Sequence, residues 1–471
     1  MKQAGMPIYI YNSLTRKKEE LIPLKPPKVN IYTCGVTVYD ESHIGHARSL
    51  YVFDVIRRYL KYREFKVNFV RNITDIDDKI INRAHEIKKD WKDLTAKYID
   101  MYYEDLAKLG IAKGDFEPRA TENIPDMIRF IEGLIDKGYA YVTDTGVYFN
   151  VRKSKDYGKL SGQGIDQMLK GVRKEPDETK EDPLDFALWK KSKPEEPSWD
   201  SPWGKGRPGW HIECSVMSQK FLKTDTLDIH AGGRDLIFPH HENEIAQAEA
   251  LSGKPFAKYW LHHGLLTING QKMAKSLGNF VTIKDFMDKY KDADLLKLFF
   301  LCAHYAHPID YNDKRIDETK EALERILILL GKIEDKRLRI KANGLKAENK
   351  ELEELKNKFI RAMDDDFNMP EGLAAIFELV SLTNKNIEDA NFTSEAKKLL
   401  FELKDIFGLD LKKRIGAKDL PAGVTVIIER RNDARKRGDF EEADKIRKEL
   451  EAKGIILEDT KDGKTTWRRK L

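Results

Sequence analysis

Histidine residues gather in three short stretches of this 471-residue chain. Histidines spread through a hydrophobic core would not group in this way, so the grouping indicates a polar site. Their side chains can bind a metal ion or contact phosphate oxygens. Eight of the eleven histidines form the three groups: His43 and His46; His211, His230, His240 and His241; His262 and His263.

The first group lies in His43-Ile44-Gly45-His46, where a predicted strand gives way to a predicted helix. The first turn of a helix offers N–H groups and the positive end of the helix dipole. Two histidines one turn apart there can contact phosphate oxygens while charge shifts during phosphoryl chemistry. Gly45 would let a flat base pack against the backbone. The alternative is a capped amphipathic helix that carries its histidines incidentally.

A second candidate is Lys272-Met273-Ala274-Lys275-Ser276, in the loop after a predicted strand over 260–268. Glycines flank this loop, and its two lysines stand three residues apart. Such a loop can neutralise a triphosphate as pyrophosphate leaves. Taken alone, however, the loop is more typical of an exposed basic turn.

Two cysteines, a histidine and a glutamate are candidate metal ligands. Cys34 ends the first predicted strand, Cys214 follows 180 residues later, and His240 and Glu244 share one face of a predicted helix. Two thiolates, one imidazole and one carboxylate suit tetrahedral zinc. The long separation excludes a zinc finger, so the finished fold must assemble the site at the carboxyl ends of the strands. His241 remains a rival to His240, and each cysteine alone is better explained as a buried structural thiol.

Alternating strand and helix patterns must position these residues. Strands are predicted over 28–33 and 66–70, and helices over 47–60 and 79–109. The pattern resumes with a strand over 226–230, a helix over about 240–252 and the strand over 260–268. Strand–helix–strand units with short links predict an α/β domain with a parallel sheet.

The segment between these two halves has a different composition. Residues 150–210 are dense in Lys, Glu and Pro, which favours a flexible surface insertion, although Trp189 and Trp203 within it point to ordered anchors. From Tyr311 to about Phe407 the pattern predicts a bundle of amphipathic helices. After a hinge at 416–423, helices over 424–437 and 440–453 and a hairpin over 455–468 are predicted.

Composition limits the class of protein. The chain is 41% hydrophobic, no apolar run approaches the roughly 18 residues of a membrane span, and residues 1–20 lack the apolar core of a secretory signal. Three cysteines exclude a disulfide scaffold and suit a reducing compartment. We therefore expect a globular, cytoplasmic protein with no membrane partner. Cys302, in an apolar predicted helix, is expected in the core.

The positive charge is concentrated at the C-terminal end. The whole chain has a net charge of +5, and residues 411–471 carry 18 Lys and Arg against 12 Asp and Glu, a local net charge of +6. The first 410 residues therefore have a net charge of −1. A basic module on a nearly neutral body suggests an appended domain that binds a polyanion. Solvated helix faces with a chance imbalance would look the same.

Together, the His43–His46 and Lys272–Ser276 segments, about 230 residues apart, resemble the H-I-G-H and K-M-S-K-S motifs of class I aminoacyl-tRNA synthetases. Ala274 stands where that pattern usually has Ser, but both lysines are kept. Further runs resemble the cysteinyl-tRNA synthetase family, and the resemblance covers nearly the whole chain. These runs are 32–40, 72–79, 201–214, 228–236, 239–244 and 465–470.

The resemblance implies a role for particular residues. One zinc ion per chain would be held by Cys34, Cys214, His240 and Glu244. The cysteine pocket would include Gly35, Thr74 and Trp210. The ATP contacts would include His43, Gly45, His46, Asp235, Lys272, Lys275 and Ser276, with Mg²⁺ accompanying ATP. The anticodon would be read by Arg435, Asp444, Asp459 and Trp467. Phe440 stands where the family often has Trp.

The same resemblance implies a reaction and its partners. L-cysteine would be activated with ATP to cysteinyl-adenylate and pyrophosphate, and then transferred to the 3′ end of tRNA(Cys) by a monomeric enzyme. Zinc bound to the substrate sulfur would separate cysteine from serine better than the roughly 1–3 kcal/mol of an apolar pocket, so no editing domain is expected. The alternatives are a ligase that joins cysteine to a small-molecule amine, as in mycothiol biosynthesis, and a non-catalytic zinc-containing RNA-binding module.

The expected fold is a class I synthetase Rossmann-like parallel sheet with an insertion, followed by a helical bundle and a small mixed domain. The catalytic domain would be split between 1–122 and 211–255. The other expected units are a connective insertion at 123–210, a stem-contact region at 256–312, a helical bundle at 313–415 and an anticodon-binding domain at 424–471.

Overall fold

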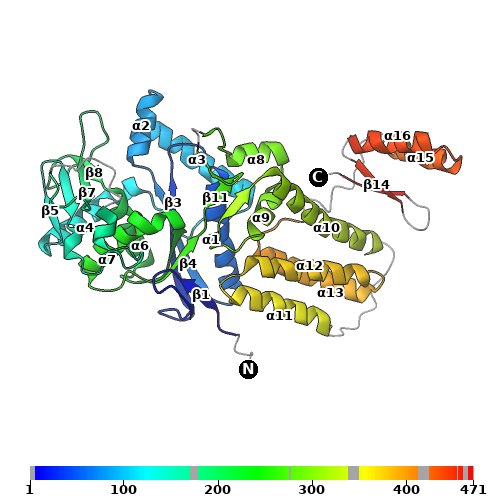
Figure 1. Ribbon diagram of the computed structural model, residues 1–471, viewed down its shortest axis with the longest axis horizontal. Coiled ribbons are helices and arrows are strands. Elements are labelled where there is room, and N and C mark those ends of the chain that lie inside the picture. The colour runs from blue at the N-terminus through cyan, green and yellow to red at the C-terminus, as the bar shows by residue number, and fades with distance from the viewer. Residues whose placement is uncertain are drawn as a thin grey trace.

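A four-stranded parallel sheet forms the centre of the computed structural model (Figure 1), which describes residues 6–169, 179–274, 277–337, 349–411, 424–452, 455–459 and 465–469. The strand order is β10-β9-β3-β4. Ile31 of β3 pairs with both Phe69 of β4 and Ile229 of β9, which fixes the register. The strand bounds are Lys28–Thr37 for β3, Lys66–Thr74 for β4, Leu227–Gly233 for β9 and Ala257–His263 for β10.

Helices cover both faces of this sheet because consecutive strand residues point to opposite sides. Ile31 and Phe69 join a core with α1, whereas Tyr32 and Val70 join a second core with α6. The predicted parallel α/β arrangement is therefore confirmed. The helices of this half are α1 Ile44–Tyr62, α2 Asp78–Glu86, α3 Trp91–Leu109, α4 Ile124–Asp136, α6 Trp210–Leu222 and α7 Glu242–Ser252. Short helical turns are η1 Ala120–Asn123, η2 Val151–Lys153, η3 Arg234–Leu236 and η4 Ile237–His241.

The insertion forms a four-stranded antiparallel sheet in the order β5-β6-β7-β8. Its strands are Ala140–Val142, Gly146–Phe149, Phe186–Lys191 and Gly206–Pro208, and α5 spans Ile165–Leu169. The Lys/Glu/Pro composition misled the prediction of flexibility for the described part of this segment. Trp189 is fully buried, with its ring centroid 6.2 Å from that of Trp203, so the two tryptophans are the anchors that the sequence suggested.

The prediction of a single strand over 260–268 is wrong, because strand β10 ends at His263 and the next strand begins at Leu266. The N–H of Gly264 donates to the carbonyl of Tyr305 at 2.9 Å, and a Cβ at Gly264 would lie 2.2 Å from the carbonyl of His307. We call this close approach of Gly264 to residues 305–307 the crossing at Gly264. After it, the chain enters a separate three-stranded sheet in the order β12-β11-β13. Its strands are β11 Leu266–Ile268, β12 Gln271–Lys272 and β13 Ile309–Tyr311, and a further hairpin pairs β1 Tyr9–Asn12 with β2 Lys17–Glu20.

The predicted helical region follows, with α11, α12 and α13 packed together on the side of the sheet away from the insertion (Figure 1). Cys302 corrects the sequence analysis: it is exposed, because α9 ends at Leu301 and Cys302 forms the cap. The helices are α8 Ile283–Tyr290, α9 Ala293–Leu301, α10 Asp313–Arg337, α11 Lys350–Asp364, α12 Met369–Lys385 and α13 Ala390–Ile406.

The last unit contains the predicted two helices and hairpin. Helix α15 spans Val424–Lys436, α16 spans Phe440–Ala452, and the antiparallel strands β14 and β15 span Ile455–Asp459 and Thr465–Arg469. Thr465 accepts a hydrogen bond from Arg431 at 3.1 Å and so ties the hairpin to α15. A search of the described residues finds no helix with the length and apolar character that crossing a membrane requires.

A buried arginine joins the helix of the first histidine group to the crossing at Gly264. Arg48, on α1, is 1% exposed, and burial lowers its pKa to about 10, so it stays charged at neutral pH. Its guanidinium donates to the carbonyls of Gly264, Leu265, Tyr305 and His307 at 2.5–3.3 Å. One side chain thus fixes α1 against the segment that leads to β11 and β12.

We predict that Arg48→Met lowers the free energy of unfolding by about 3 kcal/mol, because four carbonyls would lose a charged donor. Urea denaturation followed by circular dichroism would measure the change. Arg129→Met, at a side chain that is 65% exposed, is the control and should change the value by less than about 0.5 kcal/mol. Equal stability of the two variants would contradict the role given to Arg48.

Candidate functional site

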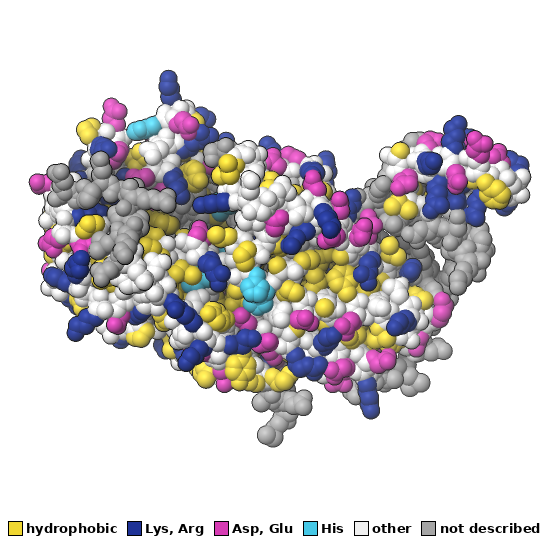
Figure 2. Space-filling view, viewed as in Figure 1, with side chains coloured by type: hydrophobic (Ala, Val, Ile, Leu, Met, Phe, Trp, Pro, Cys, Tyr) yellow, Lys and Arg dark blue, Asp and Glu magenta, His cyan; other side chains and the backbone are white. Residues whose placement is uncertain are grey.

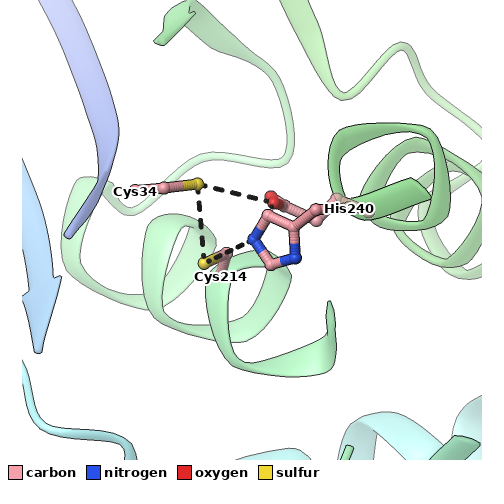
Figure 3. Close-up of side chains that lie close together, drawn as sticks. Cys34, Cys214 and His240 are labelled. Atoms are coloured by element: carbon pink, nitrogen blue, oxygen red, sulfur yellow. Dashed lines mark hydrogen bonds and ion pairs between the residues drawn. The ribbon is translucent and has the colours of Figure 1, made fainter. Parts of the chain in front are cut away.

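Four potential metal ligands converge from three parts of the chain. Figure 3 labels three of them, Cys34, Cys214 and His240. Cys34 belongs to β3, Cys214 to α6, and His240 and Glu244 flank the start of α7. The two sulfur atoms are 3.8 Å apart, and Nε2 of His240 is 3.5 Å from Sγ of Cys214. Oε1 of Glu244 is 3.6 Å from Sγ of Cys34. The structure therefore brings the four predicted ligands together.

These separations suit a tetrahedral zinc ion. Bond lengths of about 2.3 Å to sulfur and 2.0–2.1 Å to nitrogen or oxygen place two sulfurs about 3.8 Å apart, and a sulfur about 3.6 Å from a nitrogen or oxygen. Three of the separations agree with these values. Nε2 of His240 and Oε1 of Glu244 lie closer, at 2.9 Å, which is the distance of a hydrogen bond. The donor set fits zinc, and His240 and Glu244 would have to separate slightly around a bound ion.

The geometry bears on the choice between His240 and His241. Nε2 of His241 lies 3.2 Å from Sγ of Cys34, and a second group of donors contains Cys34, His230, His241 and Glu244. That group contains one thiol, whereas the group with His240 contains both. In addition, Nδ1 of His241 contacts Nε2 of His262 at 2.9 Å, which places His241 in a chain of histidines. Soft sulfur donors favour the group that contains His240.

Two of the donors are poised to be anionic. Burial opposes the carboxylate of Glu244, but His230 and His240 outweigh it and lower the pKa of Glu244. Burial also opposes the thiolate of Cys214, but hydrogen bonds with Cys34 and His240 lower the pKa of Cys214. Because Oε2 of Glu244 contacts Nε2 of His230 at 2.7 Å, its other oxygen is directed at the sulfurs.

A buried network supports the cysteine ligands, and the sequence analysis assigned no role to its central residue, Asn72. Oδ1 of Asn72 accepts the N–H of Gly35 at 2.8 Å, and its Nδ2 donates to Oγ1 of Thr74 at 3.1 Å. The Thr74 hydroxyl donates to Glu213 at 2.9 Å, next to Cys214 in the chain. Burial raises the pKa of Glu213 well above its usual range. The network therefore connects the segments that carry the two thiols.

The residues expected to form the cysteine pocket surround the same donors. A Cβ at Gly35 would lie 1.6 Å from the carbonyl oxygen of Asn72, so only glycine fits beside Cys34. The ring of Trp210 stacks on that of His240, with centroids 4.0 Å apart and an interplanar angle of 22°. Trp210 is 37% exposed, so its indole orients the histidine while its edge reaches solvent.

The first histidine pair caps α1 reciprocally. The N–H of His46 donates to Nδ1 of His43 at 3.2 Å, and the N–H of His43 donates to Nδ1 of His46 at 3.3 Å. The rings stack with centroids 3.6 Å apart. Burial lowers the pKa of His46 well below its usual value, with His43 adding to the effect. Because each Nδ1 accepts, the neutral rings carry their proton on Nε2, which is the donor that a phosphate oxygen needs.

The loop of the second motif begins beside this pair. A Cβ at Gly45 would lie 3.4 Å from Met273, so the loop approaches α1 at that glycine. Asn279 holds the loop, because its side chain accepts the N–H of Ala274 at 2.8 Å and donates to the carbonyl of Lys272 at 3.1 Å. The side chain of Lys272 is exposed. Lys275 and Ser276, which were predicted to contact ATP, lie outside the described residues.

Of the remaining predicted residues, Asp235, Arg435 and Asp444 have exposed side chains. Asp235 is exposed in η3 after β9, on the same edge of the sheet as the histidines. Arg435 and Asp444 are exposed on α15 and α16, and Phe440 is 65% exposed. Asp459 and Trp467 occupy β14 and β15, where only the backbone is described. Figure 2 shows acidic side chains among the basic ones on the visible face of this unit.

The third histidine group is structural. His262 links Nδ1 of His241 to the hydroxyl of Ser13, and its Nδ1 lies 2.8 Å from Ser13 Oγ. Nδ1 of His263 donates to the carbonyl of Gly264 at 2.9 Å. Burial lowers the pKa of His263 to about 4; Arg48 lowers it further, while the bond to Gly264 and Asp235 oppose the shift.

The comparisons with known proteins agree with the geometry. Residues 20–321 match the family described as the tRNA synthetases class I (C) catalytic domain. Residues 358–412 match the DALR domain, and residues 417–468 match the cysteinyl-tRNA ligase anticodon binding domain. A cysteine–tRNA ligase of Anoxybacillus flavithermus is 50% identical over 474 residues, covering 98% of this chain and 100% of that protein. One of Aquifex aeolicus is 49% identical and covers 99% of each chain.

Solved structures share the fold at low sequence identity. A methionyl-tRNA synthetase of Mycobacterium tuberculosis, in complex with methionyl-adenylate, has a TM-score of 0.63 and 16% identity, covering 81% of this chain and 90% of that one. A leucyl enzyme from Agrobacterium radiobacter K84, solved in a ternary complex with tRNA, has a TM-score of 0.64 and 11% identity, covering 85% and 86%. The predicted class I synthetase fold is therefore confirmed.

The buried neutral state of His263 predicts acid sensitivity. Its pKa of about 4 in the folded state lies below the roughly 6.5 of an unfolded chain, so the unfolded state binds more protons between these values. Stability should therefore fall as the pH drops from 6.5 to 4, by about 3 kcal/mol for this group. His263→Asn, which keeps a donor for the Gly264 carbonyl, should flatten that part of the curve. Urea midpoints at several pH values would test this, and parallel curves for the two proteins would contradict it.

Proposed function

The chain belongs to the cysteinyl-tRNA synthetase family of class I aminoacyl-tRNA synthetases, and we propose that it joins L-cysteine to tRNA(Cys) at the edge of the sheet where its cysteine and histidine motifs meet. The cysteine carboxylate attacks the α-phosphate of ATP, which releases pyrophosphate and forms cysteinyl-adenylate. The terminal ribose hydroxyl of the tRNA then takes the cysteinyl group and releases AMP. The observation that carries this proposal is the convergence of Cys34, Cys214, His240 and Glu244 within 4.8 Å.

We assign one zinc ion to these four side chains. Zinc supplies a Lewis acid that favours thiolate over thiol and sulfur over oxygen, which would distinguish cysteine from serine without editing. The protein's contribution is orientation. Asn72 and Thr74 fix the segments that carry the thiols, and Trp210 fixes the plane of His240. His240 and Glu244 would complete the set of ligands, and their 2.9 Å contact would give way to bonds with the ion.

The ATP site is proposed around the start of α1. His43 and His46 would donate from Nε2 to phosphate oxygens, and the helix N-terminus adds a positive dipole. Gly45, Asp235, Lys272, Lys275 and Ser276 complete the proposed set, with Mg²⁺ bound to the nucleotide. Lysines suit this position because negative charge grows on the leaving pyrophosphate.

The C-terminal unit is the proposed anticodon reader. Arg435 and Asp444 are exposed on neighbouring helices, where an arginine can contact guanine or phosphate and an aspartate can accept from a base amino group. Asp459 and Trp467 are proposed to join them from the hairpin. The exposed ring of Phe440 offers a smaller stacking surface than the Trp that the family often has there.

The other boundaries and properties are proposed in the same way. The split catalytic domain covers 1–122 and 211–255, the insertion 123–210, the stem-contact region 256–312, the bundle 313–415 and the anticodon-binding domain 424–471. The enzyme is proposed to act as a monomer in the cytoplasm, where reducing conditions keep Cys34 and Cys214 as thiols. The match of residues 417–468 to an anticodon-binding domain disfavours the small-molecule cysteine ligase.

The activity can be tested in two stages. The protein should catalyse cysteine-dependent ATP–pyrophosphate exchange and then charge tRNA(Cys). His46→Asn should slow exchange by about 100-fold, because it removes the Nε2 donor while leaving an oxygen for the N–H of His43. His85→Ala, at an exposed histidine of α2, is the matched control and should keep full exchange. Exchange without charging would favour the small-molecule ligase, and no exchange would refute both enzymes.

The metal site can be tested with two cysteines of the same chain. Cys214→Ser should lower the zinc content of the purified protein and raise the KM for cysteine by at least about tenfold, because a soft ligand is lost. Cys302→Ser should leave both values unchanged, since Cys302 is exposed and distant in sequence from the four donors. Zinc analysis and exchange kinetics supply the measurements. Unchanged zinc content in Cys214→Ser would refute the assignment.

A further inference from the structure

A cavity lies next to the proposed cysteine site, beside the residues that follow strand β4. It has a volume of about 560 Å³, within the usual range for sites that bind small molecules, and it lies between the start of α3, η1 and the loop before β8. Thr74, at the end of β4, directs its hydroxyl to Glu213 beside Cys214. The next residue, Asp75, lines the cavity instead. The cavity and the proposed cysteine site therefore share one short piece of backbone.

The walls of the cavity contain two tryptophans. The rings of Trp91 and Trp199 have centroids 6.1 Å apart and an interplanar angle of 68°. Both side chains are half-buried. An indole face at the wall of a polar cavity is a stacking surface for a nucleobase, and such stacking is tolerant of sequence.

The same cavity carries the charges that a nucleotide needs. Lys92 and Arg119 line it, with Nζ of Lys92 5.7 Å from the centroid of the Trp91 ring. Arg119 contacts Glu122 only at 3.9 Å, and its side chain is 43% exposed, so its guanidinium can turn to a phosphate. Cations beside aromatic rings are typical of sites for single-stranded nucleic acid.

A buried carboxylate completes the site. Asp75 is 5% exposed and accepts the N–H and the hydroxyl of Thr121 at 2.9 and 2.6 Å. Each carboxylate oxygen has a second lone pair and can accept from the exocyclic amino group of a base. The cavity thus combines a stacking surface, an acceptor for a base edge and two cations for a phosphate.

We propose that this cavity binds an unpaired nucleotide of the tRNA acceptor end, close to the terminal ribose that receives cysteine. The proposal rests on the function proposed above, because that function requires a single-stranded RNA end to reach the sheet edge. The base would stack on Trp91 or Trp199 with its amino group directed at Asp75, and Arg119 and Lys92 would contact the adjoining phosphate. The acidic and basic side chains that line the cavity make it unsuitable for a purely apolar ligand.

The test measures how two RNA probes bind to cavity variants and to control variants. The probes are a tRNA(Cys) transcript and the same transcript without its four unpaired 3′ nucleotides, with equilibrium binding measured at one fixed salt concentration. Trp91→Ala should weaken binding of the full transcript by about 5- to 100-fold and leave binding of the shortened one within about twofold. Arg119→Gln, a change at a partly exposed side chain, should show the same selectivity more weakly.

The control variants distinguish an effect on the cavity from an effect on the fold or on adenylation. Lys97→Ala, on the same helix as Trp91, and Arg129→Gln, at an exposed side chain of α4, should leave both binding constants unchanged. Pyrophosphate exchange should stay within about twofold in all four variants.

Equal weakening of both RNAs, or no weakening in either cavity variant, would overturn the proposal. Loss of exchange in a folded Trp91→Ala protein would also overturn it, by assigning the cavity to adenylation. Absence of exchange in the unaltered protein would refute the proposed function, while the ratio of RNA affinities would still decide the role of the cavity.

Discussion

The structure depends on bringing two sulfur atoms, an imidazole and a carboxylate into one buried space. Burying ionisable groups is costly unless they are paired or bound to a cation. Here Cys214, His240 and Glu244 are all 1% exposed or less, and Cys214 and Glu244 both lie within hydrogen-bonding distance of His240. Their mutual contacts offset part of the desolvation cost, and a divalent cation would offset more. The desolvation cost of this cluster is therefore consistent with a site that binds a metal ion.

Rigid connections hold this cluster at the edge of the sheet. The parallel pairing of β3 with β4 brings Cys34 beside Asn72, whose side chain then bonds to Gly35 and Thr74. On the other face of the sheet, Arg48 fixes α1 to the chain crossing at Gly264. The thiol end and the histidine pair of α1 are thus positioned by separate networks. In the proposed active site, a substrate that contacts both groups would meet side chains already in place, which lowers the entropic cost of reaction.

Periodicity predicted the sheet, because buried strands and amphipathic helices leave local patterns. Residue type and helical spacing marked four candidate metal ligands, and the structure brings these four side chains together from one strand and from helical segments. Periodicity could not predict the break after His263, which depends on a hydrogen bond from Gly264 to Tyr305, or the role of Asn72, whose partner Gly35 is 37 residues away. The prediction that Cys302 lies in the core is wrong because an apolar sequence does not reveal on which residue a helix ends. The pair Trp91 and Trp199 is separated by more than a hundred residues, so only the fold shows that they share a cavity.

The histidine pair shows how the proposed ATP site would use side chains that already cap a helix. In the structure, each ring accepts the backbone N–H of the other residue, so the first turn of α1 is capped without a ligand. This cap uses Nδ1 alone and therefore sets the tautomer that leaves hydrogen on Nε2. The low pKa of His46 keeps that ring neutral, so its Nε2–H is a dipolar donor whose contact with phosphate changes no net charge. Positive charge then falls to the helix dipole and to lysines such as Lys272, which enters from an exposed loop held at its base by Asn279. In the proposed ATP site, the groups that would contact the nucleotide are therefore uncharged and held by the helix cap. The lysines that would balance the leaving pyrophosphate lie on the surface, where ammonium groups are cheaply solvated until the substrate arrives.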